Sequence, residues 1–296
     1  MIPAIQLEKA TKVYKGKKAV DNLSLSIERG CVVALLGPNG AGKTTTLSMI
    51  LGLNQPTSGS IKLLGDDPRE QKIRERIGAM LQDVSVIDNL KVSETINLFR
   101  NYYKKPLPLE QLLHISGLVE EKDKYASSLS GGQQRRLGFA LAVAGDPEVL
   151  FLDEPTVGMD VSSRQLFWDT IRAMAGRGKT IVLTTHYLEE ADSVADRVIV
   201  INNGKLIADG TPSEIKAETT GRVISFTAGE SVVTEMLQEL PGVSDVEWSG
   251  RRVTLYSGNT DRLIVTLVKE QVDMRDIEIQ SGGLDDAFQA LVKQAN

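Results

Sequence analysis

The sequence predicts an α/β domain followed by a smaller α+β domain. Apolar runs of strand length occur at 31–36, 149–152 and 181–183, and the last two end in polar residues, as is typical of buried strands in an open α/β sheet. After Gly210 the pattern changes to short alternating strands and helices. With 296 residues, 41% of them hydrophobic, the chain is long enough for one large and one small domain. We expect these domains at 1–215 and 216–296.

Two further groups of elements are predicted around the large sheet. Apolar segments at 5–7 and 23–27, together with the segment 59–65, indicate a small antiparallel β layer. Between Gln82 and Asp146 the spacing of apolar residues becomes helical, which predicts a helical subdomain. Its helices are expected at 92–102, 109–116 and 132–144.

The segment between the first buried strand and a helix expected at 45–53 has the spacing of a phosphate-binding loop. It fits the pattern G-x-x-x-x-G-K-[ST], in which backbone amides surround phosphates and the lysine reaches the terminal ones. The helix N-terminus that follows favours an anion, because its amides are unpaired and it carries about half a positive charge. The predicted nucleotide-binding residues are Gly37, Pro38, Asn39, Gly40, Ala41, Gly42, Lys43, Thr44 and Thr45.

Two adjacent carboxylates follow the second buried strand. A buried strand has no structural use for Asp153 and Glu154 at its tip, because a buried charge without a partner is costly. Asp153 is placed to hold magnesium, while Glu154, one residue on, points differently and can polarise an attacking water as a general base. An exposed acidic turn before Pro155 is the structural alternative.

The third buried strand leads to His186, one of two histidines in the chain. Ligands of open α/β sheets collect at the carboxyl ends of the strands, so His186 stands where a ligand is expected. His114 has no such context, and we expect it to be an ordinary helix or loop residue.

A second pair of glycines points to a family. The pentapeptide Leu129-Ser130-Gly131-Gly132-Gln133 resembles the signature with which ABC-transporter ATPases close over a partner's nucleotide. A plain helix start capped by Ser130 is the alternative. The resemblance covers about residues 1–215 and implies the P-loop NTPase fold of an ABC ATPase domain. It also implies a homodimer of head-to-tail copies, each ATP lying between one copy's phosphate loop and Ser130, Gly131, Gly132 and Gln133 of the other.

The resemblance implies roles for the residues around the phosphates. Lys43 and His186 would contact the terminal phosphate of ATP, and Glu154 would act as the catalytic base. The residues implied for Mg²⁺ are Thr44, Gln82 and Asp153.

The roles of three further residues are assigned from the resemblance alone. Gln82 follows the apolar stretch 77–81 and resembles the Q-loop glutamine that senses magnesium and water. Tyr14 matches the aromatic residue that stacks on adenine, with a half-buried strand tyrosine as the alternative. Asp160 occupies the D-loop position, where Met159 replaces the usual leucine at similar volume.

Composition limits the class of protein and the cellular compartment in which it is expected. No apolar run approaches the ~20 residues that span a bilayer, and no signal-peptide pattern is present, so a transporter role requires separate membrane permease subunits. The net charge of −5 argues against nucleic-acid binding, and the single cysteine suits a reducing cytosol. We expect the chain at the cytoplasmic face of the cell membrane. A groove for the membrane partner, or else a core-packing segment, is expected to include Val84, Val86, Ile87 and Leu90.

The C-terminal residues predict a small domain of β-α-β-β-α-β order, the split βαβ or ferredoxin-like arrangement. Its strands are expected at 222–227, 243–248, 252–256 and 275–280, its helices at 231–240 and 261–271, and a last amphipathic helix at 284–293. The domain holds no catalytic constellation, which leaves dimer contact, regulation or effector binding as expected roles.

The resemblance extends to the ATPase subunits of bacterial exporters, including drug-resistance and antibiotic-export systems, at 158–160, 185–192 and 284–288. We therefore expect an ATP-hydrolysing subunit that powers export of a drug, antibiotic or other amphipathic compound. The alternatives are an ABC transporter for another substrate class, a soluble ABC ATPase that remodels a ribosome or DNA complex, and an ATP sensor without hydrolysis. The remodelling class commonly has two cassettes or a long coiled-coil insertion, and this sequence has neither.

Overall fold

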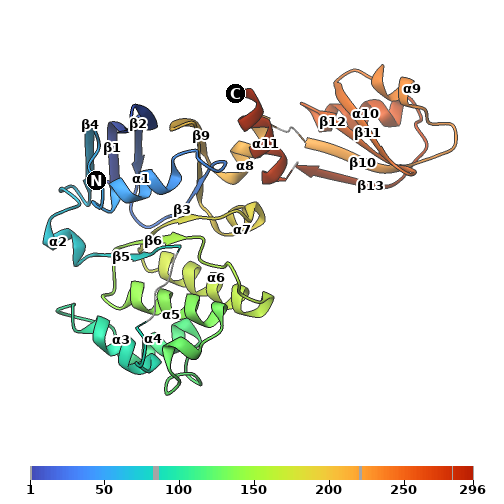
Figure 1. Cartoon of the computed structure of the whole chain (residues 1–296). Helices are drawn as coiled ribbons and strands as arrows, with labels where there is room; N and C mark the ends of the chain where they lie inside the picture. The colour runs from blue at the N-terminus through green and yellow to red at the C-terminus, as the bar shows by residue number, and fades with distance from the viewer. Residues whose placement is uncertain (1, 83–86, 220–221, 282, 296) are drawn as a thin grey trace. The chain divides into compact units, whose positions relative to one another are not determined.

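The computed structural model describes residues 2–82, 87–219, 222–281 and 283–295 (Figure 1). The chain divides into two compact units, Met1–Asp209 and Gly210–Asn296. The boundary expected after residue 215 falls inside helix α8 (Pro212–Thr219), which packs on helix α11 (Leu284–Gln294) of the second unit. Within the described ranges, no helix is both long enough and apolar enough to cross a bilayer.

A six-stranded sheet of order β5-β6-β7-β3-β8-β9 forms the centre of the first unit. Strand β3 pairs in parallel with β7 and β8, and β6 pairs in parallel with β5 and β7. Every residue of β3, β6 and β7 is buried, as expected for a parallel sheet covered on both faces. The strands are β3 (Val32–Leu36), β5 (Ile77–Met80), β6 (Val149–Asp153), β7 (Thr180–Thr184), β8 (Arg197–Asn202) and β9 (Lys205–Gly210). The α/β prediction is confirmed.

The antiparallel layer has the order β2-β1-β4. Its strands β1 (Ile5–Tyr14) and β2 (Lys17–Ile27) are longer than the predicted segments 5–7 and 23–27, whereas β4 (Ser58–Leu63) is close to 59–65. Register shifts after Leu7 and Ala10, together with a left-handed φ of 49° at Lys9, interrupt the alternation of apolar residues. A search for alternation therefore finds only the regular ends of these strands.

Helix α1 (Lys43–Ile50) joins the two sheets through one core. Its Leu47 and Ile50 are buried in the same cluster as Leu7 of β1 and Phe151 of β6. The helix begins two residues earlier and ends three residues earlier than the predicted 45–53. Leu51 caps its end, and Gly52 follows with a φ of 70° that continues no helix.

The helical subdomain contains α3 (Val92–Arg100), α4 (Leu109–Ser116) and α5 (Gly131–Val143), which contact one another and are grouped on one side of the first unit in Figure 1. The aromatic ring of Phe139 in α5 lies edge-on to that of Phe167 in α6 (Val161–Ala175), 5.0 Å away, where it anchors the subdomain to the sheet domain. The first unit is completed by α2 (Gln71–Arg74), the short 3₁₀ helix Ala126–Ser128, and α7 (Leu188–Val194).

The second unit contains a four-stranded antiparallel sheet of order β11-β12-β10-β13. The order of its elements along the chain and in the sheet is that of a split βαβ unit. Its core includes Ile224, Phe226, Leu255 and Leu263. The elements are β10 (Arg222–Ala228), α9 (Thr234–Gln238), β11 (Val243–Ser249), β12 (Arg252–Ser257), α10 (Thr260–Lys269) and β13 (Met274–Ser281).

Candidate active site

The phosphate loop links the buried strand β3 to helix α1 and leaves no room for larger side chains at two glycines. A Cβ at Gly37 would lie 2.3 Å from the carbonyl oxygen of Ile201, and one at Gly42 would lie 2.4 Å from that of Ala19. Gly42 also has a φ of 103°, which L side chains rarely adopt. The loop is therefore a close-packed backbone surface that ends at a helix N-terminus, the geometry suited to an anion.

The ammonium group of Lys43 is held inside this loop. Its Nζ donates hydrogen bonds to the carbonyl oxygens of Gly37 at 2.6 Å and Pro38 at 3.2 Å. Burial lowers the pKa of Lys43, while the nearby carboxylates of Glu154 and Asp153 act in the opposite direction. The lysine thus lies between the loop and two acidic side chains from β6 and its end.

A cavity of about 350 Å³ brings the separate motifs together. It is bounded by the phosphate loop and by residues that follow β5, β6 and β7, whose carboxyl ends meet at one edge of the sheet. Its described lining is Ala19, Asn39, Gly40, Ala41, Gly42, Lys43, Thr44, Thr45, Gln82, Asp153, Glu154 and His186. Every residue that the sequence assigned to catalysis or to magnesium lies in this lining.

Thr184 of the neighbouring strand β7 hydrogen-bonds both acidic residues at the end of β6. The Thr184 hydroxyl donates a short hydrogen bond to Asp153 Oδ1, and the backbone NH of Glu154 donates to the Thr184 carbonyl at 3.1 Å and hydroxyl at 3.2 Å. Glu154 has a left-handed φ of 50°, an uncommon conformation for a residue with a side chain. Glu154 therefore leaves the extended path of β6 directly after Asp153, the last residue of that strand.

The carboxylate of Glu154 contacts His186 directly. Oε1 of Glu154 lies 2.7 Å from Nε2 of His186. The Glu154 side chain is 14% exposed and that of His186 is 51% exposed, so the base is shielded while the imidazole faces the opening of the site. The exposed acidic turn that was the alternative for Glu154 does not occur.

The oxygen donors in the cavity suit magnesium. Mg²⁺ favours oxygen ligands and is commonly held by one or two carboxylates together with substrate phosphates. Thr44, Gln82 and Asp153 supply a hydroxyl, an amide and a carboxylate to the same cavity. In the parts of the chain that the structure describes, no cluster of three or more His, Cys, Asp or Glu side chains could hold a metal ion by itself.

The signature residues occupy the start of α5, away from this cavity. Ser130 caps the helix: its hydroxyl accepts from the Gln133 NH at 3.3 Å, and its own NH donates to Gln133 Oε1 at 2.9 Å. Gln133 also donates to Glu121 at 3.0 Å. Among the described residues lining the cavity, none comes from the segment 130–133. Within one chain, therefore, the signature and the phosphate loop are not brought together.

Tyr14 and Asp160 also lie outside the described lining of the cavity, as do Gly37 and Pro38 at the start of the phosphate loop. Tyr14 is 44% exposed at the end of β1, with the Lys12 ammonium 5.2 Å from its ring centroid. Asp160 caps α6 by accepting from the Ser163 NH at 2.8 Å and from the Ser162 hydroxyl at 2.6 Å, and these hydrogen bonds lower the pKa of Asp160. Both remain predicted nucleotide-binding residues, and both are on exposed surface.

Part of the predicted partner groove lies outside the described residues. Val84 and Val86 belong to the segment 83–86, which the structure does not describe. Of the other two, Ile87 is 42% exposed and Leu90 is half-buried.

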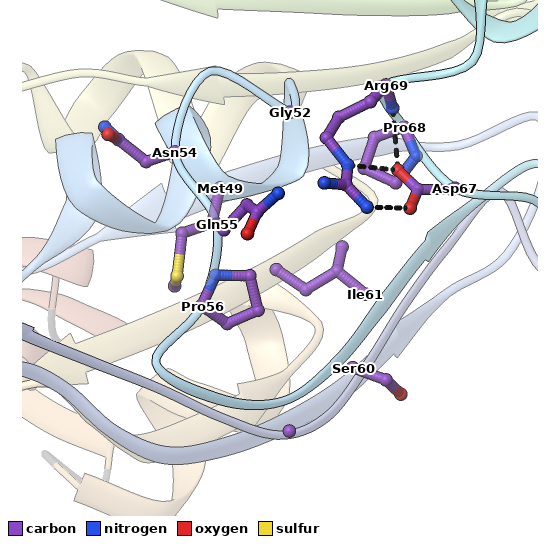
Figure 2. A pocket seen from close by; sticks show the side chains of 11 residues that line it. Met49, Gly52, Asn54, Gln55, Pro56, Ser60, Ile61, Asp67, Pro68 and Arg69 are labelled. Atoms are coloured by element: carbon purple, nitrogen blue, oxygen red, sulfur yellow. Dashed lines mark hydrogen bonds and ion pairs between the residues drawn. The ribbon is translucent and has the colours of Figure 1, made fainter.

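A separate pocket of about 270 Å³ lies between the end of α1, strand β4 and the residues that follow it (Figure 2). Met49 and Ile61 provide apolar walls, and Arg69 pairs with Asp67 at 2.6 Å, as the dashed lines in Figure 2 mark. Hydrogen bonds from Arg69 lower the pKa of Asp67 to about 2. The described lining shares no residue with the phosphate-loop cavity, so the two pockets are independent.

Sequence reasoning missed Thr184, which contacts the Asp153 carboxylate and the Glu154 backbone NH. The available signal was its position as a polar residue at the end of an apolar run, two residues before His186. Ala19 was also missed, because it reaches the phosphate loop only through the packing of β2.

Comparison with known proteins agrees with this geometry. Residues 20–157 match the family model described as "ABC transporter". A Nod factor export ATP-binding protein I from Paraburkholderia xenovorans is 37% identical, over 96% of this chain and 95% of that protein. A daunorubicin resistance ATP-binding protein from Streptomyces coeruleorubidus is also 37% identical, over 96% of this chain and 94% of that protein.

Solved structures also resemble a large part of this chain. The structure of cbiO1 from Clostridium perfringens, part of the ABC transporter complex cbiONQ, is 30% identical with a TM-score of 0.65, covering 74% of this chain and 92% of that one. A dimeric ATP-binding cassette in a post-hydrolysis state bound to ADP and Pi is 25% identical with a TM-score of 0.64, covering 70% of this chain and 98% of that one. With its phosphate loop, acidic pair and His186 at one sheet edge, and with relatives matched over nearly its whole length, this chain belongs to the ATP-binding proteins of the ABC transporter family.

Proposed function

We propose that this chain is the ATP-hydrolysing subunit of an ABC exporter for a drug, antibiotic or other amphipathic compound. The observation that carries the ATPase part is the cavity in which Lys43, Asp153, Glu154 and His186 converge. The export part is supported by the relatives named for Nod factor export and daunorubicin resistance, which align along both units of this chain. These two relatives cover 96% of this chain, whereas the cbiO1 structure covers 74% of it.

In the proposed reaction, each residue of the cavity has one task. Glu154 accepts a proton from the attacking water as general base, and its contact with His186 places the imidazole beside the reacting group. Lys43 and the loop amides bind the phosphate chain. Mg²⁺, when bound by Thr44, Gln82 and Asp153, would neutralise phosphate charge. Thr184 holds the Asp153 carboxylate and the Glu154 backbone NH by hydrogen bonds.

The signature residues are proposed to complete the site of a second copy. Ser130, Gly131, Gly132 and Gln133 are at an exposed or half-exposed helix start and do not reach the cavity of their own chain. Two copies related by a two-fold axis would present this surface to each other's ATP, since the same patch is used on both sides. Tyr14 would stack on adenine, and Asp160 would lie at the interface. Two structures similar to this chain are dimeric cassettes.

The membrane partner and the second unit complete the proposal. A permease supplied by separate subunits would contact the expected groove, whose described part is 87–90, and would hold the chain at the cytoplasmic face of the membrane. The second unit would act in dimer contact, regulation or effector binding.

The test is co-purification of this chain from cells that also express its natural genetic neighbours, followed by ATPase assays on the complex that forms. We expect a complex with a polytopic membrane protein whose ATPase rate responds to amphipathic drugs. The same preparation carrying Glu154→Gln is the control for contaminating ATPases. A complex with ribosomes or DNA instead would move the chain to the remodelling class, and a complex without turnover would make it an ATP sensor.

A further inference from the structure

A buried carboxylate outside the cavity connects the two segments that carry the catalytic pair. Glu190 of α7 is 6% exposed. Its carboxylate accepts a hydrogen bond from the Thr156 hydroxyl, 2.9 Å from each oxygen, and another from the Thr185 hydroxyl at 3.0 Å. The Nε of Arg164 in α6 lies 3.4 Å from Glu190 Oε1. One acidic group therefore joins two loops and two helices.

The two threonines flank the catalytic residues. Thr156 comes two residues after Glu154, and Thr185 immediately precedes His186. The Thr185 hydroxyl also accepts from the Tyr187 NH at 2.9 Å, so the segment on both sides of His186 is tied to the same group. Because Glu154 and His186 contact each other at 2.7 Å, any relative movement of the two loops would alter that contact.

The segment after Thr156 in turn reaches the signature helix. The Met159 NH donates to the Thr156 carbonyl at 3.0 Å, which closes a tight turn around Gly158. A Cβ on Gly132 would lie 2.7 Å from the Gly158 carbonyl oxygen, so the start of α5 rests directly on the backbone of this turn. Displacement of the turn must therefore displace the signature surface.

Because Glu190 is buried, its charge is stable only while its hydrogen-bonding and ion-pair partners stay in place. A buried charge is costly unless it is paired and hydrogen-bonded, and here Arg164 and two hydroxyls provide both. The Arg164 guanidinium is itself fixed over the Tyr187 ring, 4.9 Å from the centroid. Discrete partners of this kind favour one defined position of both loops.

We propose that Glu190 is a positioning residue for ATP hydrolysis: it couples the loop of His186 to the turn 156–160, and through Gly158 to the signature surface at Gly132. The proposal rests on the proposed function. It adds a route by which a change at one ATP site can move the signature surface that closes the other site. Glu190 itself does not line the described cavity and touches no reacting atom.

Three substitutions test the coupling with little change in shape. Thr156→Val and Thr185→Val each remove one hydroxyl, and Glu190→Gln removes the charge. Glu189→Gln is the matched control, because Glu189 is the exposed neighbour on the same helix. We expect kcat for ATP to fall about 10- to 100-fold in Glu190→Gln, the range for losing hydrogen bonds to a charged group, with affinity for ATP of the monomer unchanged. We expect the threonine variants to fall less.

A double variant separates coupling from simple destabilisation. If Thr156 acts through Glu190, Thr156→Val should cost little further kcat in the Glu190→Gln background. Wild-type kcat in folded Thr156→Val, Thr185→Val and Glu190→Gln would overturn the proposal. If Glu190→Gln does not fold, the two threonine variants decide the question alone. Absence of ATP hydrolysis by the unmodified chain with its permease would instead count against the proposed function.

Discussion

Nε2 of His186 lies 2.7 Å from Oε1 of Glu154, a contact that joins the ends of the neighbouring strands β6 and β7. The two residues come from apolar strands of similar length, and Thr184 of β7 fixes the backbone of Glu154 from the other side. The base and the histidine therefore contact each other just beyond the ends of two paired strands.

The first prediction concerns Glu154→Gln. The amide keeps the shape of the side chain but cannot accept a proton from water, so turnover should fall by roughly 10² to 10⁴, the range for general-base catalysis. ATP binding should remain, and an ATP-bound dimer should accumulate, which size-exclusion chromatography with light scattering would detect. Glu148→Gln is the control, because Glu148 precedes the other end of β6 and pairs with Arg76 on the surface. Equal turnover in both variants would remove Glu154 from the mechanism.

Thr184→Val tests the residue that sequence reasoning missed. The valine cannot donate a hydrogen bond to Asp153 or accept one from the Glu154 NH. We therefore expect the Mg²⁺ concentration for half-maximal activity to rise. We also expect kcat to fall about 10- to 100-fold, as for loss of a hydrogen bond to a charged group. Thr180→Val is matched to it, since Thr180 is buried in the same strand at the far end and accepts from the Gly30 NH. The interpretation fails if the two variants respond alike to Mg²⁺.

Gly78→Ala is expected to destabilise the first unit. A Cβ at Gly78 of β5 would lie 2.0 Å from the carbonyl oxygen of Ala142 in α5, so the helix or the strand must move. Overpacking of this kind costs about 1–3 kcal/mol or more of the free energy of unfolding. Gly176→Ala is the control, because its Cβ would meet Arg172 at an ordinary 3.4 Å.

Tryptophan fluorescence can follow that unfolding in one unit alone. Trp168 is buried in the first unit, while Trp248 belongs to the second. Urea titrations in a Trp248→Phe background should therefore show an earlier transition for Gly78→Ala than for Gly176→Ala. Coincident transitions would mean that α5 accommodates the new methyl group with no loss in the free energy of unfolding.

The single cysteine is predicted to react slowly. Burial and the nearby carboxylate of Asp196 raise the pKa of Cys31, and only the thiolate is an effective nucleophile. At pH 8, alkylation of the folded protein by iodoacetamide should be slower than that of a small free thiol, and its rate should still increase above pH 9. Alkylation in guanidinium provides the reference for the exposed residue. A folded-state rate equal to that reference would contradict the raised pKa.

The catalytic edge of the sheet could be predicted because its strands are unambiguous. The runs that became β3, β6 and β7 are buried on both faces, so apolar residues continue up to Asp153 in β6 and end three residues before His186 in β7. The strand order that brings these ends together depends on long-range pairing, for which the family resemblance supplied the expectation. The helices of the subdomain were predicted to within about two residues from their 3.6-residue spacing.

Other features depend on contacts that leave little trace in the sequence. The lengths of β1 and β2 were underestimated because bulges shift the alternation of buried residues. Glu190 stands beside Glu189 in an ordinary acidic helix start, and only the packing of α7 against the two threonines distinguishes the buried acid from its exposed neighbour. Gly132 and Gly158 are separated by 26 positions, and their close approach follows from the tertiary structure.

The most direct test of the account is whether two defective copies can restore each other. Lys43→Ala removes the loop cation, and Ser130→Asp keeps a helix cap but places a negative charge against the second copy's phosphates. Each variant alone should be inactive. Their 1:1 mixture should regain about a quarter of the wild-type ATPase rate if copies exchange at random and one intact composite site works in each mixed dimer. An inactive mixture, with mixed dimers demonstrated by affinity tags, would contradict a site completed by the second copy.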